Sequence, residues 1–128
     1  MSFPFQADKG LILVRVELSG PEGSLVVRLA LDTGATSTLI RTSVIVALGY
    51  NPASATDLIE VTTATGIEYA PRVIIDELGA LGTVKRAFPV LSHPLPPSAP
   101  IDGLLGLDFF RRAILTLDFT AGKLTLDA

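Results

Sequence analysis

The sequence predicts a single all-β domain with one or two short helices. Apolar and polar residues alternate in several short segments, as expected for strands with one buried face. Turn-forming residues separate these segments, and the chain has 11 glycines and 9 prolines among its 128 residues. This length is enough for one domain with a core of ordinary size, so we assign residues 1–128 to it.

The first two strands form a predicted hairpin. Residues 11–19 alternate, with Arg15 and Glu17 at the polar positions. The Gly-Pro-Glu-Gly sequence at 20–23 is typical of a turn, and residues 24–31 form the returning strand. This second strand leads directly into Asp32.

Residues 29–40 place one carboxylate between two apolar runs. Gly34 allows a sharp turn and a close approach of the backbone. The hydroxyl groups of Thr33 and Thr36 can bond the backbone or a partner group. Because no basic residue lies nearby in sequence to neutralise Asp32, we interpret it as an acid held for chemistry. The alternative is an Asx-type turn in which the aspartate only closes the loop.

Several elements follow before the next conspicuous motif. A short helix is expected over 42–48, with Thr42 or Ser43 as its cap and Gly49 at its end, although Val44, Ile45 and Val46 favour strands. Residues 51–56 are expected to form a loop. Residues 58–63 and 67–76 should form a hairpin around Ala64, Thr65 and Gly66.

The remaining segments predict two further strand regions and a loop. A strand is expected over 83–91, followed by a proline-rich loop over 92–100 that holds His93, the only histidine. Without an acid or nucleophile beside it, His93 is assigned a loop or surface role, which argues against Ser-His-Asp chemistry. Residues 113–118 and 123–127 should form a C-terminal hairpin.

Two motifs resemble the signatures of the retropepsin-like aspartic proteases. Residues 29–40 contain Asp-Thr-Gly-Ala after an apolar strand, and residues 101–110 (IDGLLGLDFF), roughly seventy residues later, resemble the second signature. The second motif is most similar to bacterial and eukaryotic ubiquitin-linked members. The resemblance implies a retropepsin-like closed β-barrel.

The resemblance also implies roles for individual residues. Asp32 would be the catalytic acid. The active-site loop would be supported by Thr33, Gly34, Ala35 and Thr36, and the supporting loop would contain Leu104, Leu105 and Gly106. The flap, a hairpin that covers bound peptide, would contain Thr62, Thr63, Ala64, Thr65 and Gly66. An ordinary exposed hairpin is the alternative for these last residues.

One active-site motif in the chain predicts a homodimer. Aspartic protease chemistry needs two carboxylates that share one proton. No other aspartate is followed by Thr-Gly or Ser-Gly, so the second acid should be Asp32 of another copy. Asp102 and Asp108 are interpreted as structural, with an interface salt bridge as a second possibility for Asp108. The predicted function is an aspartic endopeptidase that acts on peptide or protein substrates.

Composition bounds the partners and the compartment. A hydrophobic content of 48% and a mean hydropathy of +0.53 fit apolar surface buried in a subunit interface. The net charge of -3 argues against nucleic acid, and the absence of cysteine removes thiolate metal sites and thiol nucleophiles. No signal sequence or membrane span is recognisable, which predicts a cytoplasmic protein without membrane attachment.

Two other functions are compatible with the sequence. The fold can be retained as a peptide-binding or dimerisation module with little turnover, because the expected flap is rich in threonine and has a single glycine. A carboxylate-bound metal protein is the third interpretation, but no run of acids has a metal-ligand spacing. We therefore expect no metal and no cofactor.

Overall fold

The computed structural model describes residues 1–127, and of Thr63 only the backbone. The strands are β1 (Ser2–Pro4), β2 (Leu13–Gly20), β3 (Gly23–Leu31), β4 (Leu39–Arg41), β5 (Leu58–Thr63), β6 (Gly66–Ala80), β7 (Thr83–His93), β8 (Gly103–Leu105), β9 (Ile114–Asp118) and β10 (Lys123–Asp127). The helices are α1 (Thr42–Ala47), α2 (Leu107–Phe110) and the 3-10 turn η1 (Pro52–Ser54). This content confirms the all-β prediction with two short helices.

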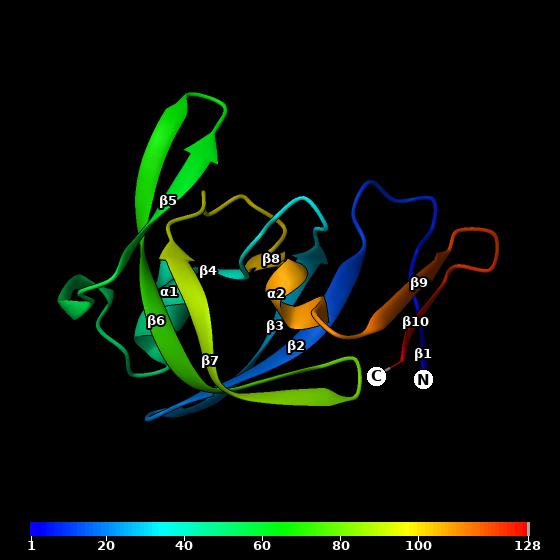
Figure 1. The fold of residues 1–128 in the computed structure, drawn as a ribbon, viewed down its shortest axis with the longest axis horizontal. Helices are drawn as coiled ribbons and strands as arrows, with labels where there is room; N and C mark the ends of the chain where they lie inside the picture. Colours follow the sequence, from blue (N-terminus) through cyan, green and yellow to red (C-terminus); the bar gives the residue numbers. More distant parts are fainter. Residues whose placement is uncertain (128) are drawn as a thin grey trace.

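Six strands close into a barrel. The large sheet has the order β2-β3-β8-β4-β7-β6-β5, and β2 also pairs with β6, so the barrel closes and β5 extends beyond it. Figure 1 shows the β5–β6 hairpin projecting from one end of the barrel and a separate sheet, β1-β10-β9, at the other. Both chain termini lie in this terminal sheet.

The alternation of residues in the sequence explains the barrel wall. In β2 the side chains of Val14, Val16 and Leu18 point into the core, whereas Arg15 and Glu17 are exposed. Side chains from other strands and from both helices complete the same core, which includes Leu29, Ile45, Ile75, Val90, Leu105 and Phe109. The barrel interior is therefore filled by side chains and gives the wall that supports the loops.

The central feature of the topology is the short strand β8. It runs parallel to β3, with Leu31 opposite Leu105, and antiparallel to β4, with Ile40 opposite Gly103. The loop between β3 and β4 contains Asp32, so β8 lies between the two strands that flank this loop.

Several predicted boundaries were wrong. The strands β1, β4 and β8 have three residues each, too short for alternation to be recognised. Strands β6 and β7 are longer than predicted, and Ser92 and His93 end β7 instead of opening the proline-rich loop. The loop expected over 51–56 contains η1, where the side chain of Asn51 accepts from the amide of Ala53.

Helix α1 forms as expected, but its predicted cap was wrong. Arg41 occupies the N-cap position and makes no side-chain capping bond. The helix forms although its residues are β-branched, because Ile45 is fully buried in the core and tertiary packing outweighs intrinsic propensity. Gly49, at a φ of +102°, reverses the chain after the helix as predicted.

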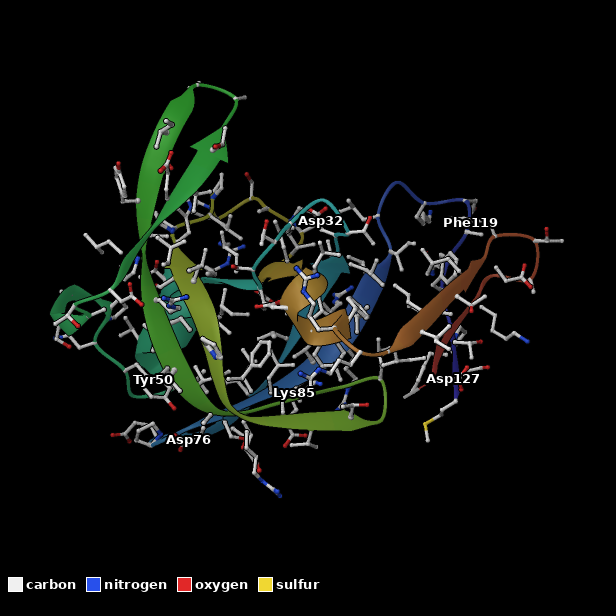
Figure 2. The ribbon with its side chains drawn as sticks, in the orientation of Figure 1. Asp32, Tyr50, Asp76, Lys85, Phe119 and Asp127 are labelled. Carbon is white, nitrogen blue, oxygen red and sulfur yellow. The ribbon has the colours of Figure 1, made fainter. Side chains whose placement is uncertain are left out.

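Tyr50 ties the end of α1 to the middle of β6. Its hydroxyl donates to Oδ1 of Asp76 and accepts from the amide of Asp76, both at 2.8 Å. Burial and then the bond to the Asp76 carboxylate raise the pKa of the Tyr50 hydroxyl above its ordinary value of 10.0. Figure 2 shows the two side chains together at one edge of the barrel.

Replacing Tyr50 should reveal this raised pKa. Because the neutral hydroxyl is favoured in the folded chain, its stabilisation is complete below the unfolded pKa of about 10 and is lost as pH rises through the higher folded value. We expect Tyr50→Phe to cost about 1 kcal/mol in free energy of unfolding at pH 7. The cost should shrink above pH 10, as measured by urea denaturation at several pH values. A cost that grows with alkalinity would contradict this assignment.

Candidate active site

The barrel positions Asp32 at the end of β3. The amide of Leu31 donates to the carbonyl of Ile12 at 2.9 Å, and the amide of Asp32 donates to the carbonyl of Leu105 at 3.0 Å. These bonds attach the start of the loop to the segment before β2 and to β8. Figure 2 shows Asp32 at the edge of the barrel, on the loop that joins β3 to β4.

The Asp32 carboxylate has two unequal oxygens. Oδ1 accepts from the amide of Gly34 at 2.8 Å, while the Asp32 carbonyl accepts from the amide of Ala35 at 3.2 Å. The Asx-type turn considered from the sequence is therefore present. Within residues 1–127 no hydrogen bond to Oδ2 is found, and the half-buried side chain leaves this oxygen available for chemistry.

The short distance between Gly34 and the Asp32 carboxylate explains why a glycine occupies this position of the motif. A Cβ atom at Gly34 would lie 3.1 Å from Oδ1 of Asp32, a tight contact with the oxygen that the same residue's amide already binds. The neighbouring Thr33 and Thr36 are exposed on the loop, and Ala35 is half-buried. Of the four predicted loop residues, Gly34 contacts the carboxylate and Ala35 bonds the Asp32 carbonyl.

The predicted supporting residues contact the loop from β8. Leu104 pairs with Ala30 and with Leu39, and Leu105 is fully buried. Beyond the strand, the amide of Leu107 donates to the carbonyl of Ala35 at 2.8 Å. Residues 105–107 therefore lie against the Asp32 loop, and Leu104 pairs with the strands on either side of it.

Gly106 is required by the close approach of two backbones. A Cβ atom there would lie 2.7 Å from the carbonyl carbon of Ser37 and 2.9 Å from the carbonyl oxygen of Ala35. Its amide donates to Oγ1 of Thr38 at 3.1 Å. The glycine therefore lets the segment after β8 lie directly on the Asp32 loop.

Sequence reasoning missed the role of Thr38. Its side chain is fully buried, and its hydroxyl donates to Oδ1 of Asp108 at 2.7 Å. The Thr38 amide also donates to both carboxylate oxygens of Asp108, at 3.0 and 2.9 Å. A single threonine thus joins the end of the Asp32 loop to α2. The signal in the sequence was a hydroxyl residue directly before the buried Leu39.

The other structural aspartate fixes the approach to β8. Oδ2 of Asp102 accepts from the amide of Arg28 at 3.1 Å. The largely buried guanidinium of Arg41 donates to the carbonyls of Leu95, Pro96, Ala99 and Ile101, and its Nε lies 3.7 Å from Asp102 Oδ1. Both Asp102 and Asp108 are engaged within their own chain, as their structural interpretation requires.

The predicted flap residues lie at the tip of the β5–β6 hairpin. Thr62 is opposite Ile67 and Thr63 is opposite Gly66, with Ala64 and Thr65 at the turn. The base of the hairpin packs through Ile59 and Val61 on a small apolar cluster that also contains Leu39, Ala70, Leu91, Leu95 and Leu104. The cluster joins the hairpin to β4, which follows the Asp32 loop, and to β8, which lies between β3 and β4.

A cavity of about 560 Å³ lies elsewhere, between the N-terminal segment, β2 and the turn that joins β6 to β7. Its lining includes Phe3, Leu13, Arg15, Glu77 and Leu81, but not Asp32. The Asp32 loop is the stronger candidate for the functional site than this cavity, because it presents a carboxylate with an oxygen that is available for chemistry.

A closed β-barrel in which a strand between β3 and β4 supports an Asp-Thr-Gly loop defines the class of aspartic proteases. The comparisons agree: a family model described as aspartyl protease matches residues 14–109. The chain therefore belongs to the aspartyl protease family.

A solved structure shares the fold. It is a retropepsin-like aspartic protease from Rickettsia conorii, with a TM-score of 0.73 and 17% sequence identity, and the match covers 99% of this chain and 89% of that one. The retropepsin-like fold prediction is confirmed. No curated protein matches the sequence significantly. The particular likeness to eukaryotic ubiquitin-linked members stays a prediction.

The described part of the chain contains no helix that is long and apolar enough to cross a membrane.

Proposed function

We propose that this chain is an aspartic endopeptidase that acts as a homodimer, with one Asp32 from each subunit. The observation that carries the proposal is the state of the Asp32 carboxylate. One oxygen is fixed by the Gly34 amide, and no described group binds the other. A fixed carboxylate with one available oxygen can share a proton with its symmetry copy.

The proposed chemistry divides two tasks between two identical side chains. One ionised carboxylate takes a proton from a water molecule, which attacks the carbonyl carbon of the scissile peptide bond. The other carboxyl, protonated, donates a hydrogen bond to the carbonyl oxygen and then supplies the proton to the leaving amine. The Gly34 amide keeps each carboxylate in the orientation that both tasks need.

Exposed groups of the single chain support dimerisation. Thr33 is exposed, and its hydroxyl makes no hydrogen bond within the part of the chain that the structure describes. We propose that it bonds to the partner's active-site loop. Large apolar side chains are also exposed, among them Leu11, Leu13, Ile114 and Phe119. Burying them between subunits would explain the high mean hydropathy.

We propose that the substrate is an extended peptide held under the β5–β6 hairpin. Its backbone would bond to hairpin residues 62–66 and to the loop at Gly34 and Ala35. Alternate side chains of an extended peptide point to opposite sides, so half of them would face the apolar cluster beneath the hairpin. This arrangement predicts a preference for apolar residues beside the cleaved bond.

The pH dependence follows from the shared proton. Because one carboxyl of the dyad must stay protonated, the rate should fall as pH rises past the higher apparent pKa of the pair. We expect a maximum at about pH 4 to 6 for cleavage of a peptide library followed by mass spectrometry. A maximum above pH 8 would contradict a dyad mechanism. In the proposed cytoplasmic location, the enzyme would work on the alkaline side of this maximum.

Mixing subunits tests the dimer directly. If each site needs two Asp32 residues, an excess of Asp32→Asn chains should inhibit the wild-type protein by forming mixed dimers, and the specific activity of the wild type alone should rise with its concentration. Asp118→Asn is the matched control, because asparagine keeps the Oδ1 atom that accepts from the amides of Thr120 and Ala121. A shared site would be contradicted if Asp32→Asn did not inhibit the wild-type protein and the specific activity of the wild type did not depend on its concentration.

The second candidate function is a peptide-binding or dimerisation module. The threonine-rich tip of the hairpin favours it, because Thr62, Thr63 and Thr65 are more restricted than the glycines of a freely moving lid. In this case the wild-type protein and Asp32→Asn should bind the same peptides with equal affinity and cleave none of them.

A further inference from the structure

We propose that Glu68 and His93 are positioning residues that hold the β5–β6 hairpin over the cleft, and that they do so when the imidazole is protonated. The inference deepens the proposed function, because it takes the hairpin to be the flap. It assigns a regulatory task to the single histidine, which the proposed chemistry leaves unused.

The two residues come from different parts of the fold. Glu68 lies on β6 opposite Val61, on the face of the hairpin that also carries Ala70 and Ile59. His93 is the last residue of β7 and lies opposite Arg41 of β4. His93 Nε2 is 2.7 Å from Oε2 of Glu68, so this contact joins the hairpin to the barrel.

The hydrogen-bonding pattern around the ring requires two donors. On one side Nδ1 lies 2.9 Å from the carbonyl oxygen of Pro94, and on the other Nε2 faces the Glu68 carboxylate. A carbonyl and an ionised carboxylate only accept, and a neutral imidazole has a single N–H. Both contacts are hydrogen bonds when the ring is an imidazolium. Loss of the second proton leaves a lone pair facing one of the two oxygens.

Among the described residues, the charged groups nearest in the sheet to the ring have partners other than His93. Arg41, its neighbour across the β4–β7 pair, donates to four carbonyls of residues 95–101 and lies near Asp102. Arg72, further along β6, is bound through Nε to Asp57 at 2.7 Å. With side-chain exposures of 24% for His93 and 49% for Glu68, solvent can reach the pair and exchange its proton.

The consequence is a hairpin whose attachment depends on pH. Histidine changes charge between about pH 5 and 8, the range in which an aspartic dyad also loses activity. On the acid side the imidazolium fastens the hairpin. On the alkaline side the attachment weakens, so peptide is held less well, and KM should rise before kcat is affected.

Glu68→Gln separates this pair from the dyad. A glutamine amide can donate to the lone pair on Nε2 of a neutral ring and its carbonyl oxygen can accept from a protonated one, so the hairpin should stay attached at both pH values. Glu77→Gln is the matched control, because Glu77 lies on the same strand and its partner is Arg86, at 2.9 Å, which does not titrate in this range. Both changes remove one carboxylate.

The first experiment uses chains that carry Asp32→Asn, so that catalysis plays no part. Amide hydrogen exchange of residues 59–70, corrected for intrinsic rates, should show about two- to fivefold less protection at pH 7.5 than at pH 5. The Glu77→Gln background should behave in the same way, whereas Glu68→Gln should remove the difference. Equal protection at both pH values in the Asp32→Asn chain, or no effect of Glu68→Gln, would overturn the proposal.

Nitrogen-15 spectra of the ring give a second test, because the chain has one histidine. We expect both nitrogens to carry protons at pH 5 and the neutral ring to keep its proton on Nδ1, facing Pro94. A neutral ring protonated on Nε2 would keep the Glu68 bond without charge and would overturn the proposal.

Kinetics on active protein give the third readout. The rise of KM between pH 5 and 7.5 should be about two- to fivefold smaller in Glu68→Gln than in wild type or Glu77→Gln, with kcat following the same profile in all three. An identical rise of KM in all three proteins would overturn the proposal. If no protein cleaves peptide, the proposed function fails, while the exchange and ring measurements still decide the role of the pair.

Discussion

Asp32→Asn is expected to lower kcat by about a thousandfold or more. Asparagine neither accepts the proton of the attacking water nor donates one to the leaving amine, so both tasks of the dyad are lost. The loop should keep its shape, since Oδ1 of asparagine still accepts from the amide of Gly34. The loss should therefore appear in a protein with wild-type circular dichroism and an unchanged dimer dissociation constant.

The measurement is a rate of peptide cleavage under identical conditions for wild type, Asp32→Asn and Asp118→Asn. The control should retain wild-type activity, because its turn keeps both hydrogen bonds. A folded Asp32→Asn protein with more than a tenth of the wild-type rate would exclude the dyad. A wild-type protein that binds peptide without cleaving it would favour the binding module.

Gly103→Ala is expected to prevent folding or to cost at least about 3 kcal/mol in free energy of unfolding. A Cβ atom at this position would lie 1.9 Å from the carbonyl oxygen of Leu39 and 3.0 Å from Cα of Ile40. Both contacts are with backbone atoms of β4, so no side chain can move aside. Relief requires β8 to leave its place between β3 and β4, which would also remove the support of the Asp32 loop.

Gly79→Ala is the matched control for this prediction. Gly79 also lies in a strand of the barrel, but a Cβ atom there would have its nearest contact at 3.7 Å, an ordinary packing distance. We expect a change of less than about 1 kcal/mol. Urea denaturation of the two variants should separate them clearly. Equal stability of Gly103→Ala and the wild type would show that β8 does not occupy the position described.

Sequence patterns predicted the elements whose formation depends on neighbouring residues in the chain. The β2–β3 hairpin was recognised because side chains of β2 alternate between core and solvent and a Gly-Pro-Glu-Gly turn follows, and α1 because Gly49 ends it. The Asp32 loop was recognised from its residue types and from the family resemblance. Leu104, Leu105 and Gly106 were assigned to the supporting loop by the same resemblance. In the structure Gly106 lies against residues 35–38, the carbonyl of Leu105 accepts from the amide of Asp32, and Leu104 pairs with Ala30 and Leu39.

The features that sequence reasoning missed depend on contacts between distant segments. The strands β4 and β8 have three residues each and exist because neighbouring strands pair with them. Asp108 was interpreted as structural but its partner Thr38 was not recognised, because their link appears only when α2 lies beside the loop. His93 was assigned to a loop because prolines follow it, yet pairing with β4 extends β7 to include it. Such interactions are set by tertiary packing, which local propensity does not encode.

The position of β8 also sets when the site forms during synthesis. Asp32 and its flanking strands leave the ribosome long before the segment that supports them, since Thr38 and Gly106 are 68 residues apart and Arg28 and Asp102 are 74 apart. Contacts between residues so far apart in sequence form late in folding, because the long segment of chain between them must first be ordered. A nascent chain therefore holds Asp32 in an unsupported loop until the segment from Asp102 to Asp108 has been made. The topology thus delays assembly of the Asp32 loop until β8 and the residues after it have been made.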